Sequence, residues 1–557
     1  MQVKPRQLQS TIVCLLLFYL GCAEKSAVSD SWQPEVLAKA EAGEIYLPDF
    51  SYAGYRSGEK KPTITGDVLR VIDFGAVPDD AKDDTRALKE ALAKAEHMTG
   101  NVVIEFPAGK LLLSDYVYLQ RGQLVLRGSG SGSEGTVLQF TKPLSELPLP
   151  EHMQELQEYL VSNNKRVKKS QKLFSPFSWT GGYIWIRNKD SRGLAYLNRY
   201  DMNSLPASTL SISSAKRGKK HLVLTPDSNT EPLTDFVGKT LKINWFNKDG
   251  EGSDLLKHIY QSDVKIGERH WKNSHRPLLS QYVNLEEVEG RQLLVKEPLL
   301  HDVRSGWTAE VELFEPLSEI GIEGFSIEFP ESDYMGHHLE AGYNAIYLTD
   351  VVHSWIKDVS FTNVDNAILS DNAAFVTIED VVVDGRLGHY AVHLGKTNHM
   401  LVKGLRVDAE QMHSISFNTG CKAGVFSDVL ITKRPTLDQH CGINHQNLFD
   451  NIRLRGLSEK ADLFQHGGAG YWKPTHGAYN TFWNIDVKID LPDETSASDV
   501  LAIGGISDGP QARFIGFNSN RILQLDYGPD AYIEGVNQQG LSIASLYNYQ
   551  LNKRLKN

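Results

Sequence analysis

A short motif recurs through the second half of the chain and constrains its fold more than any other feature. In six of its eight copies it has an apolar residue, two positions that are polar or glycine, and a second apolar residue, as in Ile378-Glu-Asp-Val381. Its first positions are Ile322, Ile356, Ile378, Val402, Phe426, Phe449, Phe482 and Phe514. Successive starts lie 34, 22, 24, 24, 23, 33 and 32 residues apart.

The spacings of 22 to 24 residues fit one turn of a solenoid with three strands per turn, and the longer ones fit a turn that carries an inserted loop. A second apolar column supports this interpretation, because Ile368, Val392 and Ile415 precede their motif starts by ten, ten and eleven residues. One turn cannot bury its apolar face alone, so the turns must stack. The repeat therefore predicts a parallel β-helix.

The segment from Val71 to Phe140 supplies an independent signal. It contains the words D-F-G-A, D-D-T and F-P-A-G in that order, with an amphipathic helix expected at 84–95 and short strands around the prolines and glycines. This segment resembles the opening of the pectate-lyase-like superfamily of right-handed parallel β-helices. The resemblance implies that fold and a carbohydrate substrate, and it leaves the reaction open.

The expected fold class is all-β, a right-handed single-stranded parallel β-helix with an N-terminal capping helix and a large insertion. We expect a signal peptide at 1–22, an N-terminal extension at 23–66 and the start of the β-helix at 67–141. An insertion or irregular rungs should follow at 142–315, then rungs with the substrate groove at 316–540 and a tail at 541–557. Solenoids grow by adding rungs, which suits a chain of 557 residues.

The first residues indicate export. Lys4 and Arg6 precede an apolar run, Ile12 to Leu20, which is too short to span a bilayer and is typical of a secretory signal. Cys22 follows Gly21 as in a bacterial lipoprotein cleavage site, although Tyr19 and Leu20 depart from that pattern. We expect Cys22 to carry lipid and to anchor the protein at the outer membrane or cell surface. Plain secretion, or a periplasmic location, is the alternative.

The net charge and the cysteine content limit the partners and the disulfides that we expect. The net charge of −11 argues against nucleic-acid binding, which needs a basic face, but a locally basic cleft could still hold an acidic polysaccharide. We expect a monomer whose membrane contact is limited to a lipid anchor. Cys421 and Cys441 lie about one rung apart and could form a disulfide, but two free thiols are the favoured interpretation.

The densest polar segment runs from Arg386 to His445 and holds six of the 18 histidines. If Val392 and Ile415 face inward, then His393 and Ser416 face outward on neighbouring rungs, with Lys396 near the same edge. The candidate catalytic residues are His393, Lys396, Arg386, His413 and His440. The candidate substrate-binding residues in this segment are His389, Tyr390, Asp438 and His445.

These residue types suit β-elimination on a uronic acid. A lyase must neutralise the sugar carboxylate, remove the C5 proton and protonate the leaving oxygen. His393 and Lys396 are the expected acid–base groups, and Arg386 or His413 is expected to bind the carboxylate. Each histidine could instead only stack or hydrogen-bond along the turns.

A glycine-rich insertion further along adds His466, Tyr471 and Trp472 as candidate sugar-binding residues, because aromatic rings stack on sugar faces. The alternative is an ordinary turn. Calcium is a candidate cofactor because β-helix lyases often use it, but no contiguous ligand motif is visible and the metal ligands stay unknown. The polymer itself could be pectin, alginate or a sulfated algal uronan.

Two other functions remain open. A glycoside hydrolase needs a carboxylate pair, and Asp371, Asp384, Asp408, Glu410, Asp438 and Asp462 are available. A non-catalytic glycan-binding or adhesion β-helix is the third alternative. The sequence lacks H-E-x-x-H and a phosphate-binding loop, so metalloprotease and nucleotide-binding functions have no support.

Overall fold

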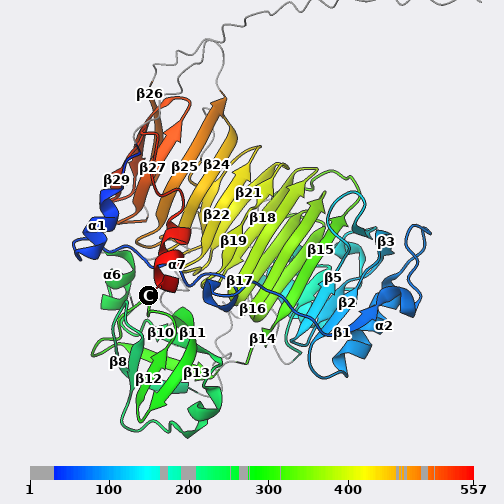
Figure 1. The fold of residues 1–557 in the computed structure, drawn as a ribbon, viewed down its shortest axis with the longest axis horizontal. Coiled ribbons are helices and arrows are strands. Elements are labelled where there is room, and N and C mark those ends of the chain that lie inside the picture. The colour runs from blue at the N-terminus through cyan, green and yellow to red at the C-terminus, as the bar shows by residue number, and fades with distance from the viewer. Residues whose placement is uncertain are drawn as a thin grey trace, which may run out of the picture.

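The chain folds into a right-handed parallel β-helix with a small β-barrel attached to its side (Figure 1). The computed structural model describes residues 31–163, 174–189, 209–250, 252–261, 274, 276–313, 315–458, 463–465, 467–468, 473–490, 500–506 and 509–556. The predicted fold class is confirmed. Cys22, His466, Tyr471 and Trp472 lie outside the described residues.

Three parallel sheets run along the β-helix, and we name them A, B and C. Sheet A carries the motif starts and is built from β2 (Val102–Glu105), β5 (Leu124–Arg127), β15 (Ile320–Glu328), β16 (Asn344–Thr362), β17 (Asn366–Asp384), β19 (Leu401–Lys403), β22 (Val425–Ile431), β24 (Leu448–Ser458), β25 (Thr481–Asp490), β27 (Arg513–Ser519) and β29 (Tyr532–Glu534). β1 (Asp67–Arg70) pairs with β2 at one end. β16 and β17 are long bent strands that contribute to all three sheets.

Sheets B and C complete each turn. Sheet B contains β3 (Gly109–Leu113), β6 (Thr136–Phe140), β20 (Arg406–Val407) and the later parts of the long strands. Sheet C contains β4 (Val117–Leu119), β7 (Ile184–Ile186), β18 (Gly388–Gly395), β21 (Gln411–Asn418), β23 (Leu437–His440) and the first parts of β16 and β17. β14 (Leu317–Ser318) pairs with β16, and β26 (Val500–Ile506) pairs with β28 (Ile522–Tyr527).

The motif starts form one unbroken ladder in sheet A, as the repeat predicted. Neighbours along the ladder are in direct register, from Ile322 beside Ile356 to Phe482 beside Phe514. Every member is fully buried in the main core. The second predicted column, Ile368, Val392 and Ile415, is a ladder in sheet C.

The third motif position explains why the motif recurs. It is glycine, aspartate or asparagine in every copy, and its backbone has a positive φ in every copy, such as 51° at Asp358, 54° at Asn484 and 70° at Gly516. Each copy therefore places a left-handed residue at the bend from sheet A to sheet B. Glycine, asparagine and aspartate are the residues that adopt this conformation at least cost.

Helix α2 (Thr85–Glu96) closes the N-terminal end of the β-helix, as predicted (Figure 1). Its apolar stripe, which includes Leu88, Ala91 and Leu92, is buried against the main core. This cap removes the open end that a stack of strands would otherwise expose.

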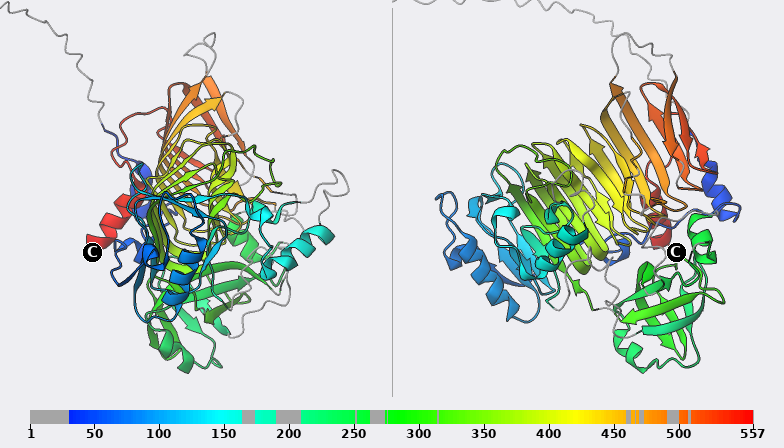
Figure 2. Two further views of the ribbon diagram at one scale, coloured as in Figure 1. Left: turned by 90° about the vertical axis from the view of Figure 1, so that its right-hand side faces the viewer. Right: turned by 180° about the vertical axis from the view of Figure 1, so that it is seen from behind.

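The insertion holds a separate closed barrel with its own core. Its strands are β8 (Thr209–Ala215), β9 (His221–Leu224), β10 (Thr240–Phe246), β11 (Pro277–Glu289), β12 (Gln292–Val295) and β13 (Thr308–Leu313). Short helix α6 (Asp254–Tyr260) joins it to the β-helix, because the Ala478 N–H donates to the Ile259 carbonyl. Earlier in the insertion, α3 (Glu151–Asn163) packs against the β-helix, on the flank seen from behind in Figure 2.

Segments near the two ends of the chain contact several rungs and each other. From α1 (Glu35–Glu41), the N-terminal segment runs back across sheet A: the Gly54 N–H donates to the His399 carbonyl, and Tyr55 hydrogen-bonds Thr377 and Glu319. Helix α7 (Leu546–Lys556) packs beside this segment, where Gln550 accepts from the Phe50 N–H. In the part of the chain that the structure describes, no helix has the length and apolar character to cross a membrane.

Candidate active site

Sheet C carries a cluster of histidines on three neighbouring strands. His389 and Tyr390 lie on β18, His413 on β21, and Asp438 and His440 on β23. The His413 ring centroid is 4.8 Å from those of Tyr390 and His440 and 5.4 Å from that of His389. The fold thus brings together five of the predicted site residues, and we call them the histidine cluster.

Asp438 is the only carboxylate among these five residues and contacts two of the imidazoles. Its Oδ1 lies 3.1 Å from His440 Nδ1, its Oδ2 lies 3.3 Å from His413 Nδ1, and Ser416 Oγ donates to Oδ2 at 2.5 Å. Burial pushes the pKa of Asp438 up, but His440, His413 and Ser416 together hold it below its ordinary value. Asp438 is therefore an anion that positions both rings.

The two rings next to Asp438 differ in charge preference. Burial lowers the pKa of His413 to about 3, so this ring is neutral. Burial also opposes the charge on His440, but Cys441 and Asp438 raise its pKa well above the ordinary value. Burial raises the pKa of Tyr390, which keeps its hydroxyl proton. The cluster therefore combines neutral and positive imidazoles with a protonated phenol.

His393 stands beside the cluster in the predicted phase. It is in register with Ser416, which is in register with Asp438, while Val392 and Ile415 point into the core. The His393 ring centroid lies 4.9 Å from that of Tyr390. Gly395 leaves room for this ring, because an added Cβ at Gly395 would lie 2.5 Å from His393 Cε1.

A loop before β16 completes the site with residues that the sequence analysis missed. His337 lies with its ring centroid 4.8 Å from that of His389 and 5.5 Å from that of His413. Glu340 Oε1 lies 3.1 Å from His389 Nδ1 and accepts from the Tyr334 hydroxyl at 2.7 Å. The 34-residue spacing from Ile322 to Ile356 indicates an insertion that contains the His337-His338 pair, but the spacing does not indicate which rung this loop contacts.

The site is largely covered in this structure. The exposed fraction is 9% for His440, 5% for His413 and 2% for His393, while His389 is fully buried. Gly467 lies against His440, since an added Cβ there would fall 1.7 Å from the ring. Within the histidine cluster His440 still has the largest exposed fraction, so its edge is the most open one.

The predicted cations lie at the ends of β18. Arg386, before the strand, pairs with Asp365 at 2.8 Å, and Asp365 also accepts from the Gly342 and Tyr343 N–H groups. Arg386 thus neutralises a buried carboxylate of the fold. Lys396, after the strand, is half-buried in a turn with φ of 49°, and its backbone N–H donates to the Thr419 carbonyl.

His445 does not join the cluster. Its Nε2 lies 3.0 Å from Nε2 of His301 in the inserted barrel, and its Nδ1 lies 2.8 Å from the Ile443 carbonyl. His445 thus belongs to the contact between the barrel and the β-helix. Cys421 and Cys441 are both free thiols, which is the favoured alternative from the sequence.

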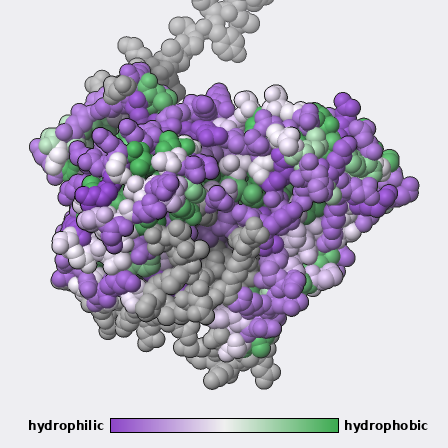
Figure 3. All heavy atoms as spheres, turned by 90° about the horizontal axis from the view of Figure 1, so that it is seen from below, coloured by the Kyte–Doolittle hydropathy of each residue, from purple (hydrophilic) through white to green (hydrophobic). Residues whose placement is uncertain are grey.

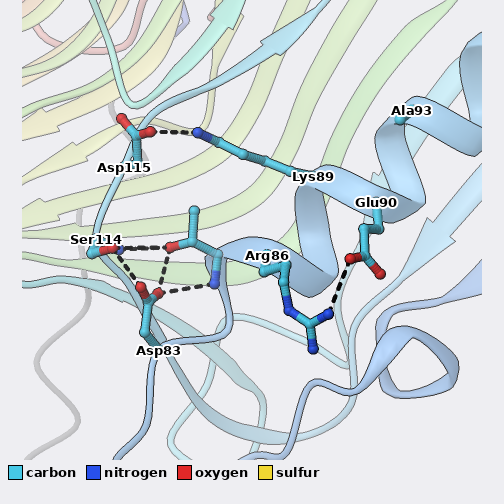
Figure 4. Close-up of a pocket in the computed structure, with 8 residues that line it drawn as sticks. Asp83, Arg86, Lys89, Glu90, Ala93, Ser114 and Asp115 are labelled. Atoms are coloured by element: carbon cyan, nitrogen blue, oxygen red, sulfur yellow. Dashed lines mark hydrogen bonds and ion pairs between the residues drawn. The ribbon is translucent and has the colours of Figure 1, made fainter. Parts of the chain in front are cut away.

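A pocket of about 440 Å³ lies elsewhere, on the capping helix (Figure 4). Lys89 reaches Asp115, Arg86 pairs with Glu90, and Asp83 bonds Ser114 and Thr85. These side chains pair with one another and fix the helix to the first rung. We therefore assign this pocket to the cap and place the candidate active site on sheet C.

Two groups of side chains in the described residues have the composition of a metal site. They are His337, His338 and His389, and His413, Asp438 and His440, and in each group the candidate ligand atoms lie within 4.8 Å of one another. Calcium prefers six to eight oxygen ligands, so neither group fits the expected calcium site. Imidazole nitrogens suit zinc and related metals.

Comparison with known proteins gives one family match. Residues 68–164 match the family model described as rhamnogalacturonase A/epimerase, pectate lyase-like. The resemblance to the pectate-lyase-like superfamily is thereby confirmed over this segment. No curated protein gives a significant match.

Several solved structures share a distant likeness. The gp54 tailspike of Acinetobacter baumannii bacteriophage AP22, solved with a capsular saccharide, is 9% identical, with 84% of this chain and 69% of the tailspike covered and a TM-score of 0.42. DFA-IIIase from Arthrobacter chlorophenolicus is 11% identical, with 84% and 94% covered and a TM-score of 0.38. The mannuronan C-5 epimerase AlgE4 A-module of Azotobacter vinelandii is 11% identical, with 85% and 79% covered and a TM-score of 0.30.

Proposed function

We propose that this protein cleaves a polysaccharide containing uronic acid by β-elimination, at the histidine cluster on sheet C. The observation that carries the proposal is the convergence of His393, His413 and His440 with Tyr390 on adjacent rigid strands. Imidazole donates and accepts protons near neutral pH, and a phenol that keeps its proton can act as a hydrogen-bond donor or a general acid. The pectate-lyase-like family match supports a carbohydrate substrate.

The reaction divides among these side chains as follows. An imidazole, that of His393 in our assignment, takes the proton from C5 of the uronic acid. The C5–H electron pair forms the C4–C5 double bond, and the C4–O bond breaks. Tyr390 or His440 gives a proton to the leaving oxygen, and positive charge at the site stabilises the carboxylate as negative charge develops on it. Lys396 is the alternative base, because it follows His393 at the end of the same strand.

The polymer should reach the cluster from the His440 edge, which is its most open side. Rungs of a parallel sheet lie roughly 4.8 Å apart, so β18, β21 and β23 together span about 10 Å, a length comparable with two sugar residues. A polysaccharide lying across these rungs would place one glycosidic bond beside His393 and Asp438.

A hydrolase is the second candidate, because of one observation. Glu340 contacts the His389 ring and Asp438 contacts the His413 ring, and the centroids of these two rings are 5.4 Å apart. Burial raises the pKa of Glu340, whereas the pKa of Asp438 is held below its ordinary value despite burial. Two carboxyl groups with pKa values pushed apart are the arrangement that an acid and a base of a glycosidase need.

One experiment separates these functions. The purified protein is incubated with pectin, alginate and sulfated algal uronans, and the ultraviolet absorbance of an unsaturated uronide is recorded together with new reducing ends. Both signals rising in parallel would support the lyase. Reducing ends without the absorbance would support the hydrolase and overturn the elimination. Polymer binding without either signal would support a glycan-binding protein.

We also propose that the protein is exported and tethered through lipid on Cys22, as the first residues predict. Labelled fatty acid should be incorporated into the wild type and not into Cys22→Ala, and the variant should leave the membrane fraction. A wild type that never incorporates the label would leave plain secretion as the explanation.

A further inference from the structure

We propose that His337, His338 and His389 bind one transition-metal ion of the zinc class. The three side chains come from two elements that are far apart in the sequence, the loop before β16 and strand β18. Their candidate ligand atoms lie within 4.8 Å of one another. The rings of His337 and His338 have centroids 3.8 Å apart, and that of His389 is 4.8 Å from His337.

His389 points to a missing ligand. It is fully buried, and neither of its ring nitrogens makes a hydrogen bond to the described residues, although Glu340 Oε1 lies within ion-pair distance of Nδ1. A buried nitrogen without a hydrogen-bond partner lowers folding stability by about 1–3 kcal/mol, so such nitrogens are rare in folded proteins. A metal ion bound at Nε2 removes this cost.

Glu340 supplies the supporting contact that zinc-binding histidines usually have. Its Oε1 lies 3.1 Å from His389 Nδ1 and is itself held by the Tyr334 hydroxyl at 2.7 Å and the His338 N–H at 3.0 Å. A carboxylate on one ring nitrogen places the proton there and leaves the other nitrogen free to bind the metal. Glu340 thus stands where a carboxylate would accept the Nδ1 proton of His389 when a metal ion binds at Nε2.

The geometry requires only a small adjustment. Nitrogens bound to one Zn²⁺ at about 2.0–2.1 Å lie roughly 3.4 Å apart, so ligand atoms up to 4.8 Å apart must approach by at most about 1.4 Å. His337 and His338 are half-buried in a loop that can make this movement, whereas His389 is fixed in a strand. Three histidines leave a fourth position open, as in catalytic zinc sites.

The site also has a role in the proposed function, and this role rests on that function. The ion would lie next to His413, whose ring centroid is 5.5 Å from that of His337. A cation at this distance from the acid–base groups would bind a sugar carboxylate during elimination. Arg386 cannot do so while it is paired with Asp365.

The test uses the purified full-length protein after dialysis against a chelator. Zn²⁺ is added and measured by calorimetry and elemental analysis, and Co²⁺ is added for its visible ligand-field absorption. We expect one equivalent of Zn²⁺, no competition from Ca²⁺, and loss of binding in His337→Ala and His389→Gln. Glu340→Gln should bind about 10–100-fold more weakly, the usual effect of losing a supporting contact.

The control is His152→Ala, which removes a half-buried imidazole that packs edge-on against Trp185 in another part of the β-helix. It should bind Zn²⁺ like the wild type. Absence of Zn²⁺ binding by the wild type would overturn the proposal. Unchanged binding by His337→Ala together with loss in His440→Gln would also overturn it, because the ion would then occupy the other group. Binding without activity on any uronan would instead contradict the proposed function alone.

Discussion

Asp438 Oδ1 lies 3.1 Å from Nδ1 of His440, two residues further along the same strand. The other carboxylate oxygen faces His413 on the next rung, so one buried anion positions two imidazoles of the proposed site. The contact depends on the pleat of β23, which sends alternate side chains to the same face.

Asp438→Asn should therefore lower turnover by about a hundredfold or more, the scale of general acid–base assistance. Its amide keeps the shape of the side chain but loses the charge that holds His440. The pH profile of kcat should change along with its value, which a merely structural role would not produce. The control is Asp428→Asn, at a left-handed bend where asparagine fits, and it should keep near-normal rates.

His393→Ala and Lys396→Ala should each lower turnover by about a hundredfold or more while thermal unfolding changes little. Gly395→Ala gives a separate check of His393, because the new methyl group would displace its ring. Gly132→Ala is the matched control, since an added Cβ there meets nothing within 4 Å. Near-normal rates in all three variants, with Asp438→Asn inactive, would favour the carboxylate-pair hydrolase.

Lys422→Met should stabilise the protein by about 1–3 kcal/mol at neutral pH, because it removes a buried charge. Burial lowers the pKa of Lys422 from 10.5 to about 8, and its Nζ donates to the Gly420 carbonyl. The unfolded chain thus binds the proton more tightly, and the wild type gains stability relative to the variant as pH rises from about 8 to 10.5. Chemical unfolding at several pH values checks this; a less stable variant at neutral pH would contradict it.

Asp450 should make stability depend on pH in the opposite direction. Burial raises its pKa from 3.8 to about 7, although Ser545, Leu546 and Ser427 donate hydrogen bonds to it. The folded state therefore holds the proton more tightly, and this stabilisation is complete below pH 3.8 and is lost as pH rises through about 7. The difference between the two pKa values corresponds to about 4 kcal/mol of unfolding free energy.

The measurement for Asp450 is the difference in unfolding free energy between the wild type and Asp450→Asn across this range. The wild type should lose unfolding free energy relative to Asp450→Asn as pH rises from 3.8 to about 7. A difference that stays constant with pH would show that the carboxyl has an ordinary pKa. Loosening of α7 should accompany the loss of stability, because Asp450 holds the start of that helix through Leu546.

Ile378→Asp or Val402→Asp should prevent folding, because each would bury an unpaired charge at a cost of several kcal/mol. These residues are neighbours in the sheet A ladder and are fully buried. Lys403→Asp, one residue later and pointing away from the core, should fold. Soluble expression and circular dichroism separate the two outcomes, and a soluble, folded Val402→Asp would contradict the inward ladder.

The sequence alone determined the β-helix, for a local reason. Each rung repeats an apolar pair around one left-handed residue, so Gly, Asp or Asn must recur at positions such as Asp380, Gly404 and Asp428. The same periodicity placed Val392 inward, and the strand pleat then put His393 on the other face. Features that repeat with the rung, including the register of His393 with Ser416, could therefore be predicted, and the structure extends this register to Asp438.

The tertiary structure decided the contacts between separate elements, which the repeat does not encode. Loops leave the rungs and return with lengths that follow no period, so the approach of His337 and Glu340 to His389 had no periodic signal. The barrel likewise removed His445 from the site, because it supplies His301 as a closer partner. The pairing of Arg386 with Asp365 depends on a turn 21 residues earlier in the chain. These contacts arise from the packing of separate elements, which residue spacing does not determine.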